Sequence, residues 1–215
     1  MIKLSKRLDL IYDLIPHNAI VADVGTDHGW LIIKAVMTGK VSLAFGLDIA
    51  EGPLSHAKAN VENYGLEDRI TLLKMDGLSQ FSEPCDTFVI AGMGAETIWS
   101  ILEQASFKTT DRILIQSNTD LPWLRKTLFM NGFRIIDERF IIDHNKPVFI
   151  LVCEYRQTSF TLIDQYIGPV LKNAKDNLAY SKYLVSRCNH LSEISKYNQS
   201  IVEEFNVLRT FIETE

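Results

Sequence analysis

The chain has 215 residues, of which 47% are hydrophobic and 23% charged, and its formal net charge is −5. This length is enough for one full hydrophobic core, and the balance of residue types is that of a globular protein. No apolar run approaches the roughly 20 residues that a membrane-spanning helix needs, so we expect no membrane association. The acidic balance argues against nonspecific binding of nucleic acid but is compatible with a local basic patch.

The N-terminus and the cysteines indicate the compartment. The first seven residues include the basic residues Lys3, Lys6 and Arg7, but no apolar segment follows them, so we do not expect a signal peptide. Cys85, Cys153 and Cys188 are odd in number and far apart. This usage suits a reducing cytoplasm and gives no zinc-binding spacing. The sequence therefore predicts a cytoplasmic protein without a bound metal.

Apolar periodicity and chain breakers predict an alternation of helices and strands. The predicted helices cover 4–15, 30–38, the stretch from near Pro53 to 64, a stretch after Gly94 to about 104, and 122–131. The predicted strands cover 19–24, 42–48, 70–75, 87–91, 112–116, 133–142 and 148–155. Five strands alternating with helices, followed by two adjacent strands, predict an α/β fold with a doubly wound sheet that ends in an antiparallel hairpin.

From about residue 158 the chain is purely helical in character, with Gly168 as its one glycine. Its apolar residues recur three and four positions apart in two series, as they do in a heptad seam. The series are Ile167, Leu171, Ala174, Leu178, Ser181, Val185 and Cys188, and then Leu191, Ile194, Asn198, Ile201, Phe205, Leu208 and Ile212. They predict a coiled-coil-like helical hairpin that turns near 188–190 and packs on itself rather than on a partner, with Asn198 fixing the register. The predicted domains are therefore 1–157 and 158–215.

The stretch from Ile20 to Trp30 carries the first functional signal. An apolar run ends in Asp23, and Gly25 and Gly29 follow four residues apart. This pattern is typical of a buried parallel strand that turns sharply into a helix and exposes bare backbone to a ligand. An ordinary strand–turn–helix corner without a ligand is the alternative, because a single glycine loop is a weak signal.

Two more acids follow the next two predicted strands. Asp48 lies 19 residues beyond Gly29, where a carboxylate can accept hydrogen bonds from the ribose hydroxyls of a nucleotide. Asp76, which precedes Gly77, is placed to accept from the exocyclic amine of adenine. Capping of the next helix and a tight turn are the respective structural alternatives. Because the carboxyl ends of parallel strands meet at one edge, the acids together predict an adenosine-binding edge.

The loop composition distinguishes between adenosine cofactors. A nicotinamide dinucleotide needs Gly-x-Gly-x-x-Gly and a helix N-terminus free for its pyrophosphate. Here Asp27 lies in the loop, where a carboxylate opposes a pyrophosphate but suits the ammonium and sulfonium of S-adenosyl-L-methionine. The reversed strand at the end of the sheet also favours a methyltransferase.

Five short segments carry a family resemblance: Leu-Ser-Lys-Arg-Leu at 4–8, Ala-Asp-Val-Gly-Thr-Asp-His at 22–28, Asp-Gly-Leu at 76–78, Ile-Ala-Gly-Met-Gly at 90–94 and Gln-Ser-Asn at 116–118. With them the chain resembles the bacterial tRNA (adenine-22-N1)-methyltransferases, a class I S-adenosylmethionine-dependent family, over essentially its whole length. The resemblance implies a Rossmann-like seven-stranded methyltransferase sheet, a C-terminal helical hairpin, S-adenosyl-L-methionine as cofactor and tRNA as substrate. Gly29-Trp30 and Ser117 depart from the usual family residues, and we expect these departures to change the fit rather than abolish activity.

The same resemblance implies methyl transfer to N1 of adenine and a set of site residues. Asp27 is expected to stabilise the growing charge or to accept the N6 proton, unless it holds the methionine ammonium. Met93 is expected to pack on the base, and Asn118 completes the catalytic set. The predicted cofactor-binding residues are Asp23, Gly25, Thr26, Asp27, Gly29, Asp48, Ile49, Asp76, Gly77 and Gly92. The predicted substrate-binding residues are His28, Trp30, Lys6, Arg7, Gly94 and Gln116, with core packing as the alternative for Trp30.

Binding of tRNA requires positive surface for phosphates. The candidates are Lys3, Lys6, Arg7, Lys34, Lys40, Arg125, Lys126 and Lys146, and the nearly charge-balanced hairpin is expected to read RNA shape.

Two alternative functions stay open: a methyltransferase of the same fold for a small molecule or protein, and a non-enzymatic adenosylmethionine- or RNA-binding module. The helical arm argues against the first, and the retained acids argue against the second. We expect a monomer.

Overall fold

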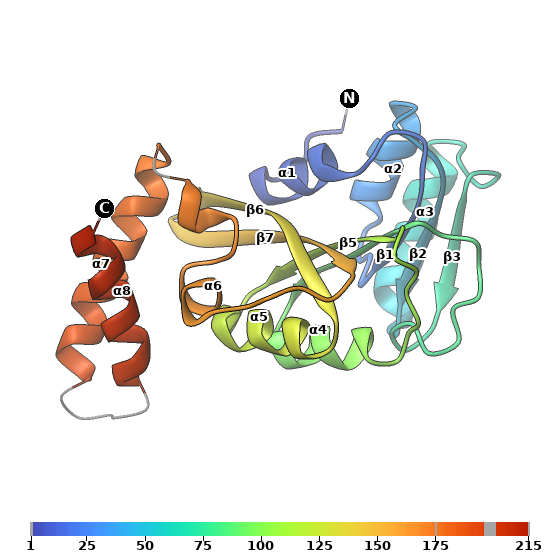
Figure 1. The fold of residues 1–215 in the computed structure, drawn as a ribbon. Helices are drawn as coiled ribbons and strands as arrows, with labels where there is room; N and C mark the ends of the chain where they lie inside the picture. Colours follow the sequence, from blue (N-terminus) through green and yellow to red (C-terminus); the bar gives the residue numbers. More distant parts are fainter. Residues whose placement is uncertain (1, 175, 196–200, 215) are drawn as a thin grey trace.

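The computed structural model describes residues 2–174, 176–195 and 201–214, in which seven strands form one sheet in the order β3-β2-β1-β4-β5-β7-β6 (Figure 1). The strands are β1 (Ala19–Val24), β2 (Val41–Asp48), β3 (Ile70–Lys74), β4 (Thr87–Met93), β5 (Arg112–Ser117), β6 (Phe133–Asp143) and β7 (Lys146–Tyr155). The first five are mutually parallel, whereas β7 is antiparallel to both β5 and β6. The predicted doubly wound sheet with a terminal antiparallel hairpin is therefore confirmed.

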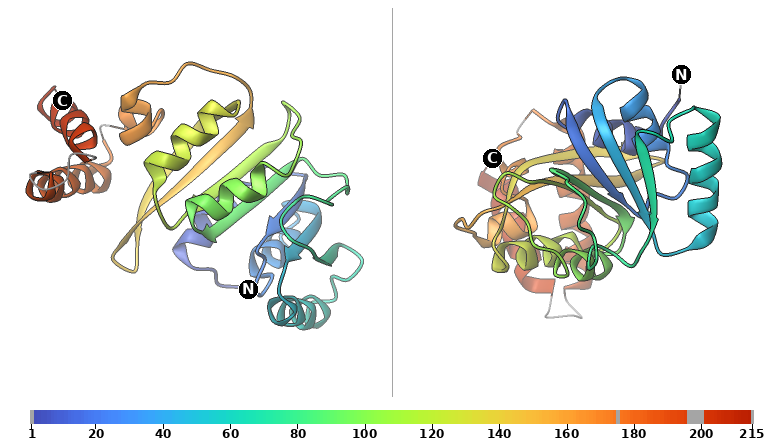
Figure 2. Two further views of the ribbon diagram at one scale, coloured as in Figure 1. Left: turned by 90° about the horizontal axis from the view of Figure 1, so that it is seen from below. Right: turned by 90° about the vertical axis from the view of Figure 1, so that its right-hand side faces the viewer.

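The helices of the α/β body are α1 (Lys6–Leu14), α2 (Trp30–Met37), α3 (Glu51–Asn63), α4 (Ala95–Leu102) and α5 (Leu121–Met130). They cover the two faces of the sheet in separate groups (Figure 2). On one face, Ile11 of α1, Ile32 of α2 and Val61 of α3 share a core with Val21 of β1. On the other face, α4 and α5 share a second core with Ala22, the next residue of β1. Successive β1 residues thus enter opposite cores, as the alternation of side chains along a strand requires.

The C-terminal part contains α6 (Leu162–Tyr166), a 3-10 turn η1 (Leu171–Asn173), α7 (Leu178–Ile194) and α8 (Val202–Thr214). The predicted turn near 188–190 is wrong, because α7 continues through these positions. The first predicted seam is also wrong, since Leu178 is 73% exposed and Val185 44% exposed. The Asn177 side chain caps α7 at its N-terminus, so Ile167, Leu171 and Ala174 belong to the connection before this helix.

The buried face of α7 is instead set by aromatic side chains. Tyr180 and Leu184 pack with Phe140 of β6 and Phe149 of β7, while Leu208 of α8 closes the same core. The C-terminal helices therefore extend a core that begins on the sheet hairpin, and a coiled-coil character is not established. The predicted role of Asn198 lies outside the described residues.

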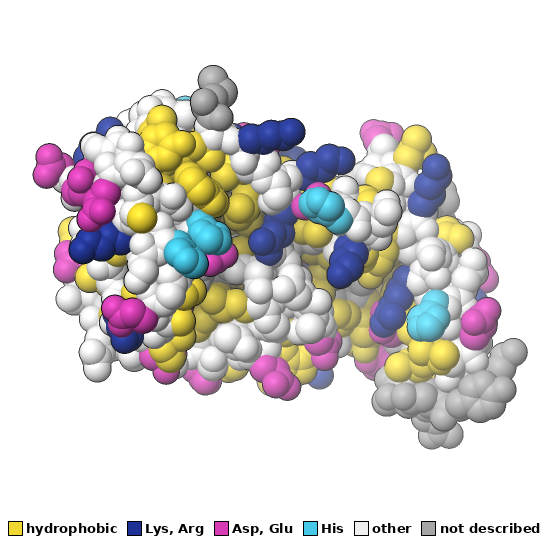
Figure 3. Space-filling model, turned by 180° about the vertical axis from the view of Figure 1, so that it is seen from behind, with side chains coloured by type: hydrophobic (Ala, Val, Ile, Leu, Met, Phe, Trp, Pro, Cys, Tyr) yellow, Lys and Arg dark blue, Asp and Glu magenta, His cyan; other side chains and the backbone are white. Residues whose placement is uncertain are grey.

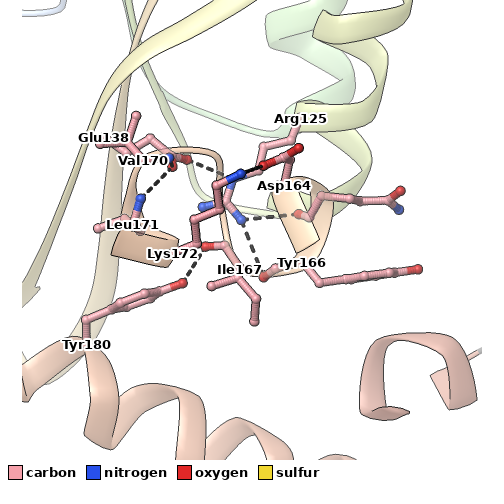
Figure 4. Close-up of polar contacts among 10 residues, drawn as sticks. Arg125, Glu138, Asp164, Tyr166, Ile167, Val170, Leu171, Lys172 and Tyr180 are labelled. Atoms are coloured by element: carbon pink, nitrogen blue, oxygen red, sulfur yellow. Dashed lines mark hydrogen bonds and ion pairs between the residues drawn. The ribbon is translucent and has the colours of Figure 1, made fainter. Parts of the chain in front are cut away.

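A buried ion pair fastens this part of the chain to the sheet (Figure 4). Arg125 Nε of α5 donates to Glu138 Oε1 of β6 at 2.9 Å, and both side chains are almost fully buried. The other carboxylate oxygen of Glu138 accepts from the backbone amide of Leu171 at 3.2 Å. Tyr180 Oη of α7 donates to the carbonyl oxygen of Ile167. The network thus joins α5, β6, the connection after α6, and α7.

Candidate active site

The loop after β1 is shaped by three residues in left-handed backbone conformations. Gly25, Asp27 and Gly29 have φ values of 79°, 44° and 71°. The backbone amides of Gly25 and Thr26 both donate to the carbonyl oxygen of Leu47 in β2, at 2.8 and 3.0 Å. The loop is therefore fixed on the second strand before α2 begins at Trp30.

Asp23 is a buried carboxylate at the end of β1. Its Oδ2 accepts a hydrogen bond from Thr26 Oγ1 at 2.8 Å, and only 7% of the residue is exposed. Desolvation, together with the nearby Asp48, raises the pKa of Asp23 to about 6, against the lowering effects of Thr26 and Arg7. Such a raised pKa is typical of an acid that receives a cationic or hydrogen-bonding ligand.

The acids of the next two strands lie at the same edge with different surroundings. Asp48 Oδ1 accepts from the backbone amide of Ala50 at 2.8 Å, so one carboxylate oxygen holds the start of α3. Ile49 is 62% exposed beside it, which suits contact with a ligand. Asp76 is exposed one residue after Met75, just beyond the end of β3. The roles predicted for Asp48, Ile49, Asp76 and Gly77 stay predictions.

The C-terminal end of β4 is held by a closed ring of hydrogen bonds with residues at and just after the end of β5. Gln116 Oε1 accepts from the Gly92 amide at 3.2 Å, and Gln116 Nε2 donates to Asn118 Oδ1 at 3.0 Å. Asn118 Nδ2 then donates back to the Gly92 carbonyl oxygen at 2.8 Å. The side chain of Met93, the last residue of β4, reaches the loop after β1, because a Cβ added to Gly25 would overlap the Met93 methyl group. Strands β1, β4 and β5 thus bring the predicted residues Gly25, Met93 and Asn118 together.

Helix α3 supports the far end of the loop after β1. The rings of His28 and His56 stack with centroids 5.1 Å apart, and Asn60 Nδ2 donates to the His28 carbonyl oxygen at 2.9 Å. Trp30 meets Tyr64 edge to face at 6.4 Å. The sequence analysis missed His56, Asn60 and Tyr64. Their four-residue spacing places them on one helix face, and this spacing is the signal that could have indicated them.

Arg7 and Lys6 were both predicted to contact substrate, and the structure places them differently. Lys6 is exposed, whereas Arg7 Nη1 donates to Gln116 Oε1 at 2.6 Å. Arg7 also lines a cavity of about 110 Å³ together with Asp23, Thr26 and Asp27. The N-terminal helix therefore contributes a guanidinium group to the site itself.

Two of the basic residues predicted for RNA binding are buried, so those predictions are wrong. Arg125 is 1% exposed in its pair with Glu138. Lys40 is 7% exposed, and its ammonium donates to the carbonyl oxygens of Tyr12 and Asp13 at 2.6 and 2.9 Å. In both cases the tertiary structure supplies the oxygen partners that a buried cation requires.

The remaining surface carries basic side chains toward the C-terminal helices. Figure 3 shows Lys and Arg side chains across one face, from the α/β body to these helices, with most acidic side chains near its outline. Within the described residues, no group of three His, Cys, Asp or Glu side chains could hold a metal ion, and no helix is long and apolar enough to cross a membrane.

Comparisons with known proteins agree with this geometry. The methyltransferase domain family matches residues 4–151. The tRNA (adenine(22)-N(1))-methyltransferase of Bacillus subtilis (strain 168) is 32% identical over 214 residues, which is 95% of this chain and 87% of the relative.

Solved structures agree over the full length. The B. subtilis M1A22 tRNA methyltransferase TrmK superposes with a TM-score of 0.89 at 28% identity, covering 99% of this chain and 100% of that chain. The Streptococcus pneumoniae protein Sp1610 in complex with S-adenosyl-L-methionine gives 0.88 at 29% identity, covering 98% and 100%. TrmK of M. capricolum in complex with S-adenosyl-homocysteine gives 0.85 at 27% identity, covering 98% of both chains. The chain therefore belongs to the methyltransferase domain family and, within it, to the S-adenosylmethionine-dependent tRNA (adenine(22)-N(1))-methyltransferases.

Proposed function

We propose that this chain methylates N1 of adenine 22 in tRNA at the cavity between α1, the loop after β1 and the C-terminal part of β4. One observation carries the proposal. The Met93 methyl group lies against Gly25, so the end of β4 and the loop after β1 converge. Asp23 and Asp27 line the cavity beside this contact, and the Gln116–Asn118 ring is joined to the cavity through Arg7.

The reaction requires alignment more than covalent catalysis. The N1 lone pair of adenine attacks the methyl carbon, and the electrons of the breaking carbon–sulfur bond stay on sulfur. S-adenosyl-L-homocysteine and a cationic methyladenine result, and loss of an N6 proton neutralises the base. A fixed loop packed against a strand end favours such a displacement, because it can hold donor and acceptor in line and exclude water.

Asp27 is the proposed acceptor of the developing charge or of the N6 proton. Its left-handed conformation lifts the side chain out of the loop, where it is 68% exposed, and its Oδ2 lies 3.8 Å from His28 Nε2. Asp27 is therefore free to meet an incoming base, whereas Asp23 is buried and already bonded to Thr26. His28, Trp30 and Gly94 are proposed to contact the base, which must leave its pairing to expose N1.

The C-terminal helices are proposed to hold the tRNA. A cleft of about 640 Å³ runs from Asn118 along Lys126 to Tyr183 and Arg187 of α7, so it connects the active edge with the arm. The basic face in Figure 3 supports the same path. We propose that 1–157 binds the cofactor, that 158–215 contacts tRNA, and that the chain acts as a monomer in the cytoplasm.

The function is tested by incubating the protein with labelled S-adenosyl-L-methionine and an unmodified tRNA transcript. We expect label transfer and a reverse-transcription stop at position 22. A matched transcript with guanine at this position should accept no label. Transfer to the control transcript, or a stop elsewhere, contradicts the assignment, and cofactor binding without any transfer favours the non-enzymatic alternative.

The role of Asp27 is tested by Asp27→Asn, which keeps the size of the side chain and removes its charge. We expect turnover to fall by about 100-fold, within the usual range for a proton-transfer group, while cofactor affinity changes less than threefold. Asp23→Asn serves as the matched control, because it should weaken cofactor binding instead. A large loss of cofactor affinity in Asp27→Asn would mean that Asp27 holds the methionine ammonium.

A further inference from the structure

We propose that Trp123 stacks on the base of a nucleotide that flanks adenine 22 in the bound tRNA, and that Lys126 contacts a neighbouring phosphate. This inference rests on the proposed function, because it says how the cleft beside the active edge holds that substrate. It makes Trp123 a residue that binds an unstacked base of the substrate.

The cleft adjoins the active edge. Asn118 lines this cleft of about 640 Å³, and Asn118 Nδ2 donates to the Gly92 carbonyl oxygen at 2.8 Å. The cleft therefore starts at the ring that holds the end of β4. Trp123 and Lys126 line it from α5. A polynucleotide whose target base enters the active edge can thus place an adjacent nucleotide in the cleft.

One aromatic ring of the cleft is available to a ligand. Four aromatic side chains line the cleft, and three of them are engaged within the protein. Phe149 and Tyr183 pack on each other with ring centroids 5.3 Å apart, and Tyr166 Oη donates to Glu203 Oε1 at 2.7 Å. The fourth, Trp123, is half-buried and pairs with no other aromatic ring among the described residues. Trp123 is therefore the side chain on which a base can stack.

A cation lies beside this ring. Trp123 and Lys126 are three residues apart on α5, so they are neighbours on one face of the helix. Lys126 is exposed, whereas Arg187 on the other side of the cleft donates to both carboxylate oxygens of Glu204, at 2.8 and 3.0 Å. The charge of Lys126 is thus available for a phosphate. An aromatic ring beside a cation is typical of sites that bind single-stranded nucleic acid.

The backbone that carries Trp123 is fixed before tRNA binds. The Asp120 side chain caps α5, and its Oδ1 accepts from the Trp123 amide at 3.2 Å. Ser117 Oγ donates to the carbonyl oxygen of Thr119 at 2.6 Å, which holds the turn between β5 and α5. A ring on an ordered helix start loses little conformational freedom when a ligand binds, so more of the stacking energy remains for affinity.

The chemistry of the reaction supplies an unstacked base for this ring. N1 of adenine lies on the pairing edge, so the target base must leave its pairing and its stack before methyl transfer. The base next to it then loses one stacking neighbour, and an indole ring can take that place. Because every base has a π-face, such a contact tolerates any base identity. The cleft is thus expected to recognise the open state of the RNA rather than its sequence.

The test pairs a change in the protein with a change in the tRNA. Filter binding measures the affinity of wild type, Trp123→Leu and Trp123→Phe for an intact transcript. It also measures their affinity for two abasic transcripts, which lack the base immediately before or immediately after adenine 22. We expect removal of the stacked base to weaken binding by wild type by about 5- to 100-fold, the range for one base on an aromatic side chain. Trp123→Leu should bind the intact and abasic transcripts alike, and Trp123→Phe should keep part of the difference.

Two controls separate stacking from other effects. Phe129 lies on the same helix but stacks on Phe160, at 4.6 Å between ring centroids, and does not line the cleft. Phe129→Leu should therefore keep the whole difference between the transcripts. Trp123→Leu should also leave the dependence of affinity on salt unchanged, because stacking releases no counterions. Lys126→Met should lower the slope of this dependence by about one.

Other outcomes overturn the proposal in distinguishable ways. Equal binding of all three transcripts by wild type overturns it without any variant. An equal loss in wild type and Trp123→Leu shows that the missing base disturbs the tRNA itself, and a loss of cofactor affinity in Trp123→Leu places the ring in the cofactor site. If adenine 22 is methylated but the transcripts are not distinguished, only this proposal fails. If wild type binds no tRNA, the proposed function fails and this proposal with it.

Discussion

At the scale of single residues, the buried carboxylate of Asp23 couples cofactor binding to pH. Its pKa is raised from 3.8 in the unfolded chain to about 6 in the folded protein. The folded state therefore binds more protons than the unfolded state between these values, and the free energy of unfolding falls as pH rises through this window. Ionised Asp23 thus destabilises the unliganded protein near neutral pH, by roughly 3 kcal/mol at most.

Asp23→Asn should remove the destabilisation that the buried charge causes. It should also remove the proposed contact between this carboxylate and the cofactor. We expect the unliganded variant to be more stable than wild type at pH 7.5, with the difference vanishing below about pH 3, because Asp23 is then protonated in both the folded and the unfolded state. Urea denaturation at a series of pH values measures this, and calorimetry should show weaker cofactor binding at pH 7.5. A variant that is less stable than wild type at pH 7.5 contradicts the pKa shift.

Gly25 combines a left-handed backbone with a close approach of Met93. Gly25→Ala should cost about 1 kcal/mol for the backbone and a further 1–3 kcal/mol for the overlap with the Met93 methyl group. Gly39→Ala is the matched control, since Gly39 has a φ of 72° but no atom within 4 Å of its Cβ position. Thermal unfolding should show the larger loss at Gly25, and the added change Met93→Ala should recover part of it. Equal losses of stability at both glycines would mean that the overlap with Met93 does not contribute to the effect of Gly25→Ala.

At the scale of elements, Lys40 attaches α1 to the segment between α2 and β2. The buried ammonium caps the C-terminal end of this helix through the carbonyl oxygens of Tyr12 and Asp13, and it also lies 4.5 Å from the centroid of the Tyr12 ring. A cation is favourable at the C-terminal end of a helix. Because α1 carries Arg7 into the site, its position matters for the cofactor.

Lys40→Met should therefore lower the free energy of unfolding by about 1–3 kcal/mol, because two carbonyl groups lose a charged donor. The affinity for tRNA at fixed cofactor saturation should stay unchanged. Lys126→Met, which removes an exposed cation beside the cleft, should do the opposite and weaken tRNA binding without changing stability. Filter binding at several salt concentrations measures the tRNA affinity of both variants, and urea denaturation measures their stability. If Lys40→Met weakened tRNA binding without a loss of stability, Lys40 would be an RNA-binding residue, as the sequence predicted.

At the scale of the whole molecule, the buried pair of Arg125 and Glu138 connects the α/β body to the C-terminal helices. Breaking a buried pair from one side leaves an uncompensated charge. In this chain Arg125 would lose its carboxylate, and the Leu171 amide would lose its acceptor. The connection before α7 is expected to loosen as a consequence.

Glu138→Ala should cost about 3–5 kcal/mol and expose the C-terminal helices to proteolysis. Asp137→Ala is the control on the same strand, because its pair with Arg139 is partly exposed to solvent and should be worth less than about 1 kcal/mol. Urea denaturation and limited proteolysis with mass spectrometry measure both effects. Similar costs for the two variants would show that the buried pair does not join the two parts.

The order of the elements, and the sheet edge at which we propose that the cofactor binds, were predicted from the sequence alone. Alternating apolar runs separated by glycine and proline specify parallel strands, and the acids at their ends must then converge. The expected strands agree with the structure within one or two residues. Met93 lies against Gly25 and bonds to Asn118, while the site roles of these residues and of Asp23 stay predictions. Local chemistry was sufficient here, because a strand and its turn are specified by neighbouring residues.

Only the tertiary structure determined which residues far apart in the chain are in contact. The heptad spacing after residue 158 did not specify where α7 begins or which face is buried, because Phe140 and Phe149 of the sheet hairpin select that face. The charges of Arg7, Lys40 and Arg125 resembled those of surface cations in the sequence, yet each one finds oxygen partners supplied by distant segments. Burial of a cation depends on these partners, and a one-dimensional pattern does not contain them.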